Sequence, residues 1–315
     1  MKNKRKILIL FAILLLTGCT KQLKDINGQV VKHPITGQNL VENIICRPED
    51  PESIKKYEEA GIDLSKYPTC NEFSPFKTKY EGIWTNIFVK PLAWLILKVG
   101  YIVKDYGLSL IIITILIRLL LYPLTNSTAM QSENLTKAKP ELDKLEKKYA
   151  GKNDQDSMMR KSQEMMLIYK KYNINPLSSC LFALIQIPLL ISFYEAMNRI
   201  PAIFEGKFLH VIDLGKTAAS AFSDVLNGAS AINLLYILLP IIVTLVTHFS
   251  FKLNKTAATS ETTDNMMKLM PIYMVAIIGF SSIFISTAIC LYWIANSTFT
   301  IIQNIIVKRR SQNAK

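Results

Sequence analysis

The chain has 315 residues, half of them hydrophobic, and carries a formal net charge of +13. Its positive mean hydropathy and several long apolar runs place it among membrane proteins. The excess of Lys and Arg lies beside those runs, without a zinc-finger, helix-turn-helix or RNA-recognition signature, so membrane topology explains the charge better than nucleic-acid binding does.

Residues 1–18 are predicted to be a lipoprotein signal peptide. A basic start at Lys2–Lys6 precedes an apolar run, Ile7–Leu16, that is too short for a normal span. The sequence LTGC at 16–19 resembles a bacterial lipobox, which predicts cleavage before Cys19 and a lipid on its sulfur. An ordinary signal peptide or an uncleaved anchor is the alternative, and in each case the residues that follow lie outside the cytoplasm.

Residues 19–82 are predicted to be a polar extracytoplasmic segment. Residues 20–82 contain five prolines and little apolar periodicity, so we expect a loosely structured chain with one short helix near 51–60. Cys46 and Cys70 lie in an oxidising compartment and can pair. The sequence does not give their separation, so two free thiols are the open alternative.

Residues 83–107 are predicted to be an external interfacial helix and a linker. The apolar run 83–104 is interrupted by Pro91 and three lysines, and it contains Trp and Tyr residues typical of the membrane interface. A span here would place the ten Lys and Arg of 126–176 outside the cell, against the positive-inside rule.

The first predicted span, 108–125, contains an arginine. A polar stripe at helical spacing runs along it: Thr114, Arg118, Tyr122 and Thr125. Arg118 either snorkels to the lipid headgroups or faces a water-filled cavity, and the second interpretation is favoured because intramembrane charges are usually functional. Of the other predicted spans, one contains a carboxylate, Glu195, near its far end. The sequence therefore predicts an unpaired, hydrated Arg118 that can attract an acidic ligand.

Four more spans are predicted after a cytoplasmic helical hairpin at 126–176, whose two helices are separated at 150–156. The run 268–306 is too long for one helix and should divide near 281–287. The spans lie at about 177–197, 232–251, 268–283 and 286–306, and a basic cytoplasmic tail follows at 308–315. The predicted fold is an all-α polytopic membrane protein whose five-helix core covers 108–307, with the amino terminus outside and the carboxyl terminus inside.

Methionines are concentrated in the second helix of the hairpin, at positions 158, 159, 165 and 166. We expect them to pack within the hairpin itself. A flexible surface for varied apolar clients is the alternative.

The last span has its own polar stripe: Trp293, Asn296, Thr300 and Gln303. Gln186 and Thr244 add uncharged polar groups to other spans, where such groups commonly form interhelical hydrogen bonds. A charge needs solvation more than an amide does. Arg118 and the face of Trp293 are therefore predicted to share a hydrophilic groove.

Four motifs resemble, in order and spacing, the YidC family of membrane protein insertases over roughly 83–307. They are IRLLLYPLT at 117–125, YKKYNINPLSSCLFALIQIP at 169–188, MPIY at 270–273 and LYWIANSTFTIIQ at 291–303. The lipobox and the five spans resemble the Gram-positive lipoprotein type. The resemblance implies a groove that opens to the cytoplasm and to lipid and receives clients. Its expected residues are Arg118, Thr114, Trp293, Tyr292, Asn296, Gln303 and Gln186.

The resemblance also implies the function and the partners. The protein is expected in a bacterial cell membrane as an insertase and folding chaperone, acting alone or with the Sec translocon on nascent membrane proteins delivered by ribosomes. This chemistry is non-covalent, so we expect no catalytic residue. The histidines at 33, 210 and 248 are scattered and the cysteines lack CxxC spacing, so we also expect no metal or cofactor. The alternatives are a small-solute transporter and a passive scaffold lipoprotein. Many transporters are built from internal repeats, and this sequence shows none.

Two features depart from the family pattern. Ser250 and Phe251 stand where many relatives end the third span with glutamines, and Ser286 and Ala288 stand where many place Pro and Gly. The tail is also short, with nine residues after Ile306, which weakens the expectation of a ribosome contact there.

Overall fold

The computed structural model describes residues 20–152, 154–175, 178–228, 231–253 and 261–313. The predicted signal peptide and Cys19 lie outside these residues. The described chain is mostly helical and divides into two compact units. Unit 1 lies within Met1–Leu116, Ile187–Val243 and Phe280–Ala295, and unit 2 within Ile117–Gln186, Thr244–Gly279 and Asn296–Lys315.

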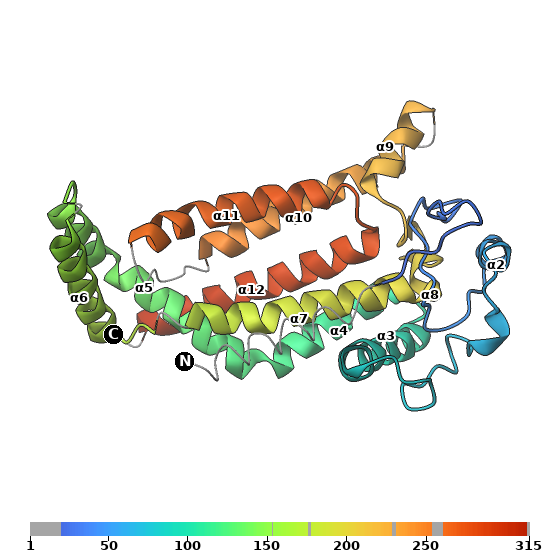
Figure 1. Cartoon of the computed structure of the whole chain (residues 1–315), viewed down its shortest axis with the longest axis horizontal. Helices are drawn as coiled ribbons and strands as arrows, with labels where there is room; N and C mark the ends of the chain where they lie inside the picture. The colour runs from blue at the N-terminus through green and yellow to red at the C-terminus, as the bar shows by residue number, and fades with distance from the viewer. Residues whose placement is uncertain (1–19, 153, 176–177, 229–230, 254–260, 314–315) are drawn as a thin grey trace. The chain divides into compact units, whose positions relative to one another are not determined.

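Figure 1 labels the main helices. The amino-terminal elements are α2 (Pro51–Glu59), the 3-10 turn η1 (Leu64–Lys66), the π-turn η2 (Thr85–Val89) and α3 (Lys90–Val103). The longer helices are α4 (Tyr106–Leu120), α5 (Tyr122–Tyr149), α6 (Gln155–Lys171), α7 (Ser178–Arg199), α10 (Asn233–Leu253), α11 (Glu261–Ser281) and α12 (Thr287–Asn313). Short elements connect α7 to α10: α8 (Pro201–Phe204), β1 (Lys207–Phe208), β2 (Ile212–Asp213) and α9 (Ala218–Leu226), and the two strands pair antiparallel.

The first predicted span ends earlier than expected. α4 ends at Leu120, and α5 begins at Tyr122 after a bend of 73°. Pro123 lies in the first turn of α5, where its missing N–H costs no helical hydrogen bond, so the proline starts a new helix rather than extending α4. Residues 121–125 therefore belong to the bend and to α5.

Within the described residues, three helical stretches are long and apolar enough to cross a membrane: Thr85–Val103, Asn233–Leu253 and Thr287–Asn313. The bent pair of α4 and α5 also passes this test when it is taken as one span, and Leu269–Ser281 is a shorter apolar helix. The predicted interfacial stretch 83–104 thus has the length and composition of a span. The count of five spans remains a prediction.

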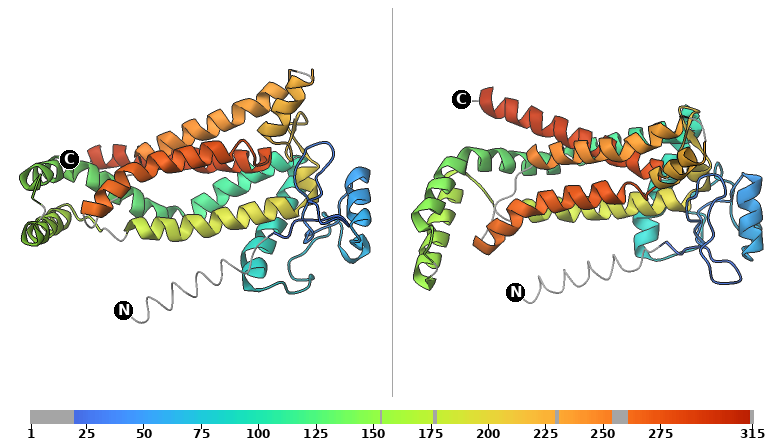
Figure 2. Two further views of the ribbon diagram at one scale, coloured as in Figure 1. Left: turned by 45° about the horizontal axis from the view of Figure 1, so that its top comes forward. Right: turned by 90° about the horizontal axis from the view of Figure 1, so that it is seen from above.

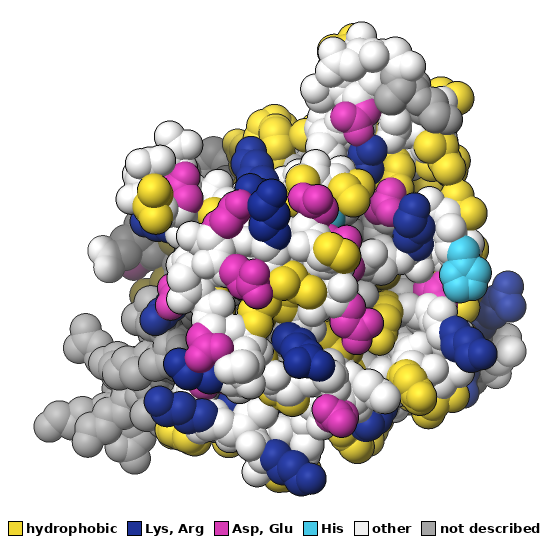
Figure 3. All heavy atoms as spheres, turned by 90° about the vertical axis from the view of Figure 1, so that its right-hand side faces the viewer, with side chains coloured by type: hydrophobic (Ala, Val, Ile, Leu, Met, Phe, Trp, Pro, Cys, Tyr) yellow, Lys and Arg dark blue, Asp and Glu magenta, His cyan; other side chains and the backbone are white. Residues whose placement is uncertain are grey.

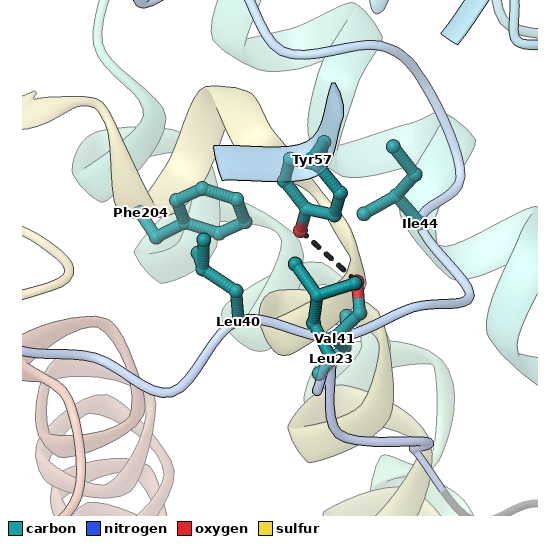
Figure 4. Close-up of a cluster of buried hydrophobic side chains, with 6 residues drawn as sticks. All are labelled: Leu23, Leu40, Val41, Ile44, Tyr57 and Phe204. Atoms are coloured by element: carbon teal, nitrogen blue, oxygen red, sulfur yellow. Dashed lines mark hydrogen bonds between the residues drawn. The ribbon is translucent and has the colours of Figure 1, made fainter. Parts of the chain in front are cut away.

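The amino-terminal segment is ordered around an apolar core, and the expectation of a loosely structured chain is wrong. Figure 4 shows this core, whose buried members are Leu23, Leu40, Val41, Ile44, Tyr57 and Phe204. The Tyr57 hydroxyl donates to the Val41 carbonyl at 3.0 Å, so its polar atom is satisfied inside the cluster. Burial also raises the pKa of Tyr57, which keeps the hydroxyl a neutral donor. Each large apolar side chain buried in this way contributes about 1.5–3 kcal/mol.

Two local features shape the same segment. The predicted helix near 51–60 is α2, whose first turn is capped by the Asp50 carboxylate accepting from the Ser53 N–H at 2.9 Å. Cys46 and Cys70, left open by the sequence, form a disulfide. The bond closes a loop of the chain between positions 46 and 70, and this loop contains α2 and η1.

A network of charged side chains joins the parts of unit 1, and all of its members except the partly exposed Glu81 are buried. The Glu81 carboxylate pairs with Lys90 at 2.9 Å and also with Arg199. Arg199 pairs in turn with Glu195, one helical turn away, at 3.0 Å. The other oxygen of Glu195 accepts from the Trp84 indole N–H at 3.1 Å. Two positive and two negative groups thus balance each other in a place where an isolated charge would be costly.

Arg199 also binds the backbone of the amino-terminal segment. Its Nε donates to the Asn43 carbonyl at 2.6 Å, and its own carbonyl accepts from the Ile45 N–H at 2.9 Å. Removing one member of a buried ion pair such as Arg199 and Glu195 typically lowers the free energy of unfolding by about 3–5 kcal/mol. The network therefore attaches residues 43–45 to the end of α7.

In unit 2, α5 and α6 lie side by side, as Figures 1 and 2 show. Ala138, Tyr169 and Ile174 are buried between them, with Leu142 and Met165 packed against these residues. The expectation that the methionines all pack inside is wrong for three of them, because Met158, Met159 and Met166 are exposed.

Each helix of this pair ends on a Lys–Tyr dipeptide that binds a glutamate of the other helix. Lys148 and Tyr149 donate to the Glu164 carboxylate at 2.7 and 2.8 Å. Lys171 and Tyr172 donate to Glu141 at 2.5 and 2.8 Å. Both glutamates have a pKa below the ordinary value of 4.5, and the hydrogen bond from the lysine is the main cause in each case.

We predict that Glu141→Gln and Glu164→Gln each loosen the α5–α6 pair, because each amide loses an ionic hydrogen bond. Hydrogen exchange of the α5 and α6 amides in the full chain should become faster at neutral pH, and faster still in the double variant. In the unaltered protein, a lowered carboxyl pKa means that this stabilisation is present above pH 4.5 and is lost as the pH falls below it through the lowered pKa values.

The matched control for these variants is Asp143→Asn, which removes an exposed carboxylate on the same helix. Its exchange rates should match those of the unaltered protein. Equal acceleration by Asp143→Asn, or none by the double glutamine variant, would show that the two Lys–Tyr contacts do not hold the helices together.

Candidate functional site

Arg118 is the centre of a polar site inside unit 2. It lies in the last turn of α4, and its side chain is 1% exposed. Its Nε donates to the Asn296 side-chain oxygen on α12 at 2.7 Å. Its Nη2 donates to the Gln186 side-chain oxygen on α7 at 2.6 Å. Three helices that are distant in sequence thus meet at one guanidinium group.

The prediction that Arg118 is unpaired is wrong, because its guanidinium donates to two amide oxygens, from residues 68 and 178 positions away. Its hydration stays a prediction. The sequence offered no carboxylate partner, and it did not indicate that amide side chains would take that place. Both amides are uncharged, so these two bonds solvate the guanidinium without cancelling its charge. Hydrogen bonds to a charged group contribute about 1.5–3 kcal/mol each, which offsets part of the cost of burial.

The same face of α12 makes a second contact two turns further on. Gln303 donates through its side-chain nitrogen to the Thr125 hydroxyl at 2.9 Å. Arg118 precedes the bend between α4 and α5, and Thr125 follows it. Asn296 and Gln303 therefore hold α12 against both sides of the bend.

Three of the predicted site residues belong to unit 1. The Thr114 hydroxyl is buried and donates to the Leu110 carbonyl of its own helix at 2.6 Å. The buried ring of Tyr292 stacks on Phe193, with centroids 4.3 Å apart, and Trp293 is half-buried. The structure thus brings together Arg118, Gln186 and Asn296, and separately Gln303 with Thr125. It places Thr114, Tyr292 and Trp293 in the other unit.

The buried pair of Glu195 and Arg199 was not predicted, and only Glu195 was noted, near the far end of its span. The spacing of four residues on one helix was the available signal, since such a Glu and Arg face each other across one turn. Within the described ranges, no group of three or more His, Cys, Asp or Glu side chains is placed to hold a metal ion.

Comparison with known proteins adds a family signal over most of the chain. The model of the family described as 60Kd inner membrane protein matches residues 98–314. A membrane protein insertase YidC of Oceanobacillus iheyensis is 33% identical over 246 residues, which cover 76% of this chain and 90% of that protein. The membrane protein insertase MisCA of Bacillus subtilis is 35% identical over 235 residues, covering 74% of this chain and 82% of the relative. A crystal structure of an active YidC insertase with its first transmembrane domain resolved aligns with 72% of this chain and 47% of its own, with 21% identity and a TM-score of 0.43.

We predict that Asn296→Ala lowers the free energy of unfolding by about 1.5–3 kcal/mol, because it removes one acceptor from a buried charged donor. Asn304→Ala is the matched control, since among the described residues the Asn304 side chain donates to the Thr300 carbonyl of the same helix and to no other helix. Unfolding of both variants in mixed detergent micelles should show the larger loss for Asn296→Ala. Equal losses would mean that the Arg118 contact contributes nothing particular to stability.

Proposed function

The chain belongs to the YidC family of membrane protein insertases, and we propose that Arg118 provides the polar step on the path by which client segments enter the bilayer. The observation that supports this proposal is a buried guanidinium that donates to two neutral amide oxygens, those of Asn296 and Gln186. A permanent positive charge at such a place attracts the acidic tail of a client. The same charge would serve no purpose in a passive anchor.

The energy of this attraction is large enough to matter. Two unit charges 4 Å apart interact by about 4 kcal/mol at an effective dielectric constant of 20. A client carboxylate that replaces one amide oxygen at Arg118 exchanges a neutral acceptor for a charged one, which adds this attraction between opposite charges to the hydrogen bond. Gln186 and Asn296 thus keep the guanidinium solvated until a client arrives. The apolar part of the client then leaves into lipid, where no charge is needed.

We propose that Gln303 acts with this group as part of the polar path, because it holds α12 at the bend next to Arg118. Thr114, Tyr292 and Trp293 of unit 1 are proposed as further client contacts on the strength of the family motifs. Cys19 is proposed as the lipidation site after cleavage of residues 1–18, a prediction that lies outside the described residues.

The proposed topology has five spans, with the amino-terminal segment outside and the α5–α6 pair and the tail in the cytoplasm. Ten Lys and Arg in 126–176 support the inner position of that pair. In Figure 1, α3 is seen nearly along its axis, whereas the parts of α7 and α10 that belong to unit 1 run across the view. This difference in direction supports an interfacial position for α3, although its length would allow a span.

The proposed partners follow from the same topology. Clients reach the protein from ribosomes on the cytoplasmic side, where α6 exposes Met158, Met159 and Met166, and the protein acts on them alone or with the Sec translocon. Methionine is flexible and polarizable, so this surface suits apolar segments of varied shape. The protein thereby acts both as an insertase and as a folding chaperone in the cell membrane.

We predict a charge-dependent series at Arg118 in proteoliposomes with single-span clients. Arg118→Lys should retain much of the activity, because it keeps the charge but loses the planar fork. Arg118→Glu should reduce insertion of acidic-tailed clients at least about tenfold, since 1.4 kcal/mol of lost attraction already gives that factor. Arg118→Ala should fall between them and affect very apolar clients least.

Lys55→Glu is the control for this series, because it reverses an exposed charge on α2 in the other unit. It should insert all clients normally. Normal insertion of acidic-tailed clients by a folded Arg118→Glu variant would show that Arg118 serves only in helix packing and that the polar path is wrong.

The topology predicts opposite labelling at two exposed positions. A membrane-impermeant maleimide added to intact cells should react with Ile26→Cys, and with Lys152→Cys only after the inner face is opened. Both residues are exposed, so burial does not limit the reaction. Labelling of Lys152→Cys in intact cells would place the α5–α6 pair outside the cell and would mean that 83–104 crosses the membrane.

A further inference from the structure

A basic cavity lies in the amino-terminal part of unit 1. Its volume is about 440 Å³, and its charged lining residues are Lys66, Lys77, Lys79, Lys90, Glu72 and Glu81. The Cys46–Cys70 disulfide lies close by in the chain, and the Arg47 N–H donates to the Pro68 carbonyl at 2.9 Å, which fixes one wall. The cavity lies in residues 44–90, before position 98, where the family match begins, so family membership assigns it no role.

The acidic groups at the cavity already have partners. Glu81 pairs with both Lys90 and Arg199, and a Glu72 oxygen accepts from the Thr69 hydroxyl at 2.8 Å. On the basic side, Lys66 pairs with the exposed Asp63 at 3.2 Å.

Lys77 and Lys79 are different. Over the part of the chain that the structure describes, neither has a carboxylate within ion-pair distance. The Lys79 backbone is nevertheless held in place, because its carbonyl accepts from the buried Lys90 ammonium at 2.5 Å. The cavity therefore presents two lysines on an anchored loop to an anion.

Large apolar side chains alternate with these lysines. Phe76 is 94% exposed, and Tyr80, Ile83 and Ile87 are all more than half exposed. Lys98 of α3 donates to the Asn71 carbonyl at 2.9 Å, so the loop lies against the helix that is proposed to be interfacial. A loop with exposed aromatic residues and lysines beside such a helix is typical of the level of the lipid headgroups.

We propose that this cavity binds the phosphate of an anionic phospholipid, with Lys77 and Lys79 on the phosphate and the acyl chains along Phe76, Tyr80, Ile83 and Ile87. The free phosphate ion has the same charged group, but it does not account for the exposed apolar side chains. The neighbouring surface also argues for a local site. In Figure 3, Lys and Arg side chains on the face of unit 1 that carries α2 are interspersed with Asp and Glu, so no broad basic surface draws lipids there.

The test uses the full chain in a neutral detergent, with native mass spectrometry to count retained dioleoyl phosphatidylglycerol against dioleoyl phosphatidylcholine. The unaltered protein should retain phosphatidylglycerol preferentially. The Lys77→Glu/Lys79→Glu variant should weaken that retention by about tenfold or more, which corresponds to losing about 1.4 kcal/mol. The Lys77→Gln/Lys79→Gln variant, which removes the charges without reversing them, should also lose the preference and covers the case in which the first variant fails to fold.

The control is Lys24→Glu/Lys55→Glu, which makes the same charge change at exposed positions elsewhere in the segment. It should keep the preference. Equal retention of the two lipids by the unaltered protein, or equal loss in the control and the test variants, would overturn the proposal. Complete displacement of phosphatidylglycerol by millimolar glycerol 3-phosphate would likewise overturn it, since a site for a free anion would then suffice. None of these outcomes depends on client insertion, so the lipid site and the insertase mechanism are tested separately.

Discussion

The hydrogen bonds from Arg118 to Asn296 and Gln186 are the interaction on which the proposed mechanism depends. A buried guanidinium must be solvated, and an acidic residue would solvate it best but would also cancel its charge. Two neutral amide oxygens accept from it at 2.7 and 2.6 Å, and these two contacts do not neutralise it. The two amide contacts thus stabilise the buried guanidinium less than a carboxylate would, but they leave it able to attract an acidic client. It also links α4, α7 and α12 within unit 2, so the group that attracts clients is itself part of the structural framework.

The charges of unit 1 are arranged in the opposite way. Glu81, Lys90, Glu195 and Arg199 pair with one another, and the sum of their charges is zero. Such a network can hold the amino-terminal segment on the end of α7, but it has no net charge with which to attract a polar tail. The contrast is between a network of four paired charges, which joins segments of unit 1, and a guanidinium in unit 2 that donates to two neutral amides.

Sequence periodicity predicted the members of the site better than their partners. Helical spacing placed Arg118 and Asn296 on polar stripes, and Gln186 was recognised as a polar group inside an apolar run. It could not show that these three side chains meet, because their separations of 68 and 178 residues depend on how the helices pack. Proline patterns predicted flexibility in residues 20–82, yet Tyr57 and Phe204 complete an apolar core whose members come from distant segments. The break at Leu121 was missed because a long apolar run looks like one helix, whereas Pro123 starts a new one.

In the proposed mechanism, the charge of Arg118, rather than its hydrogen bonds, drives insertion of acidic-tailed clients. Asn296→Asp tests it most directly, since it keeps an oxygen acceptor at the same position and adds a negative charge beside the guanidinium. Insertion of one client with an acidic, a neutral or a basic tail should be measured in proteoliposomes, with Asn304→Asp on the same helix as the control. The account predicts that Asn296→Asp lowers insertion of the acidic tail and spares the neutral one, while Asn304→Asp changes the acidic-tail result far less. Unchanged insertion of the acidic tail by folded Asn296→Asp protein would contradict the account.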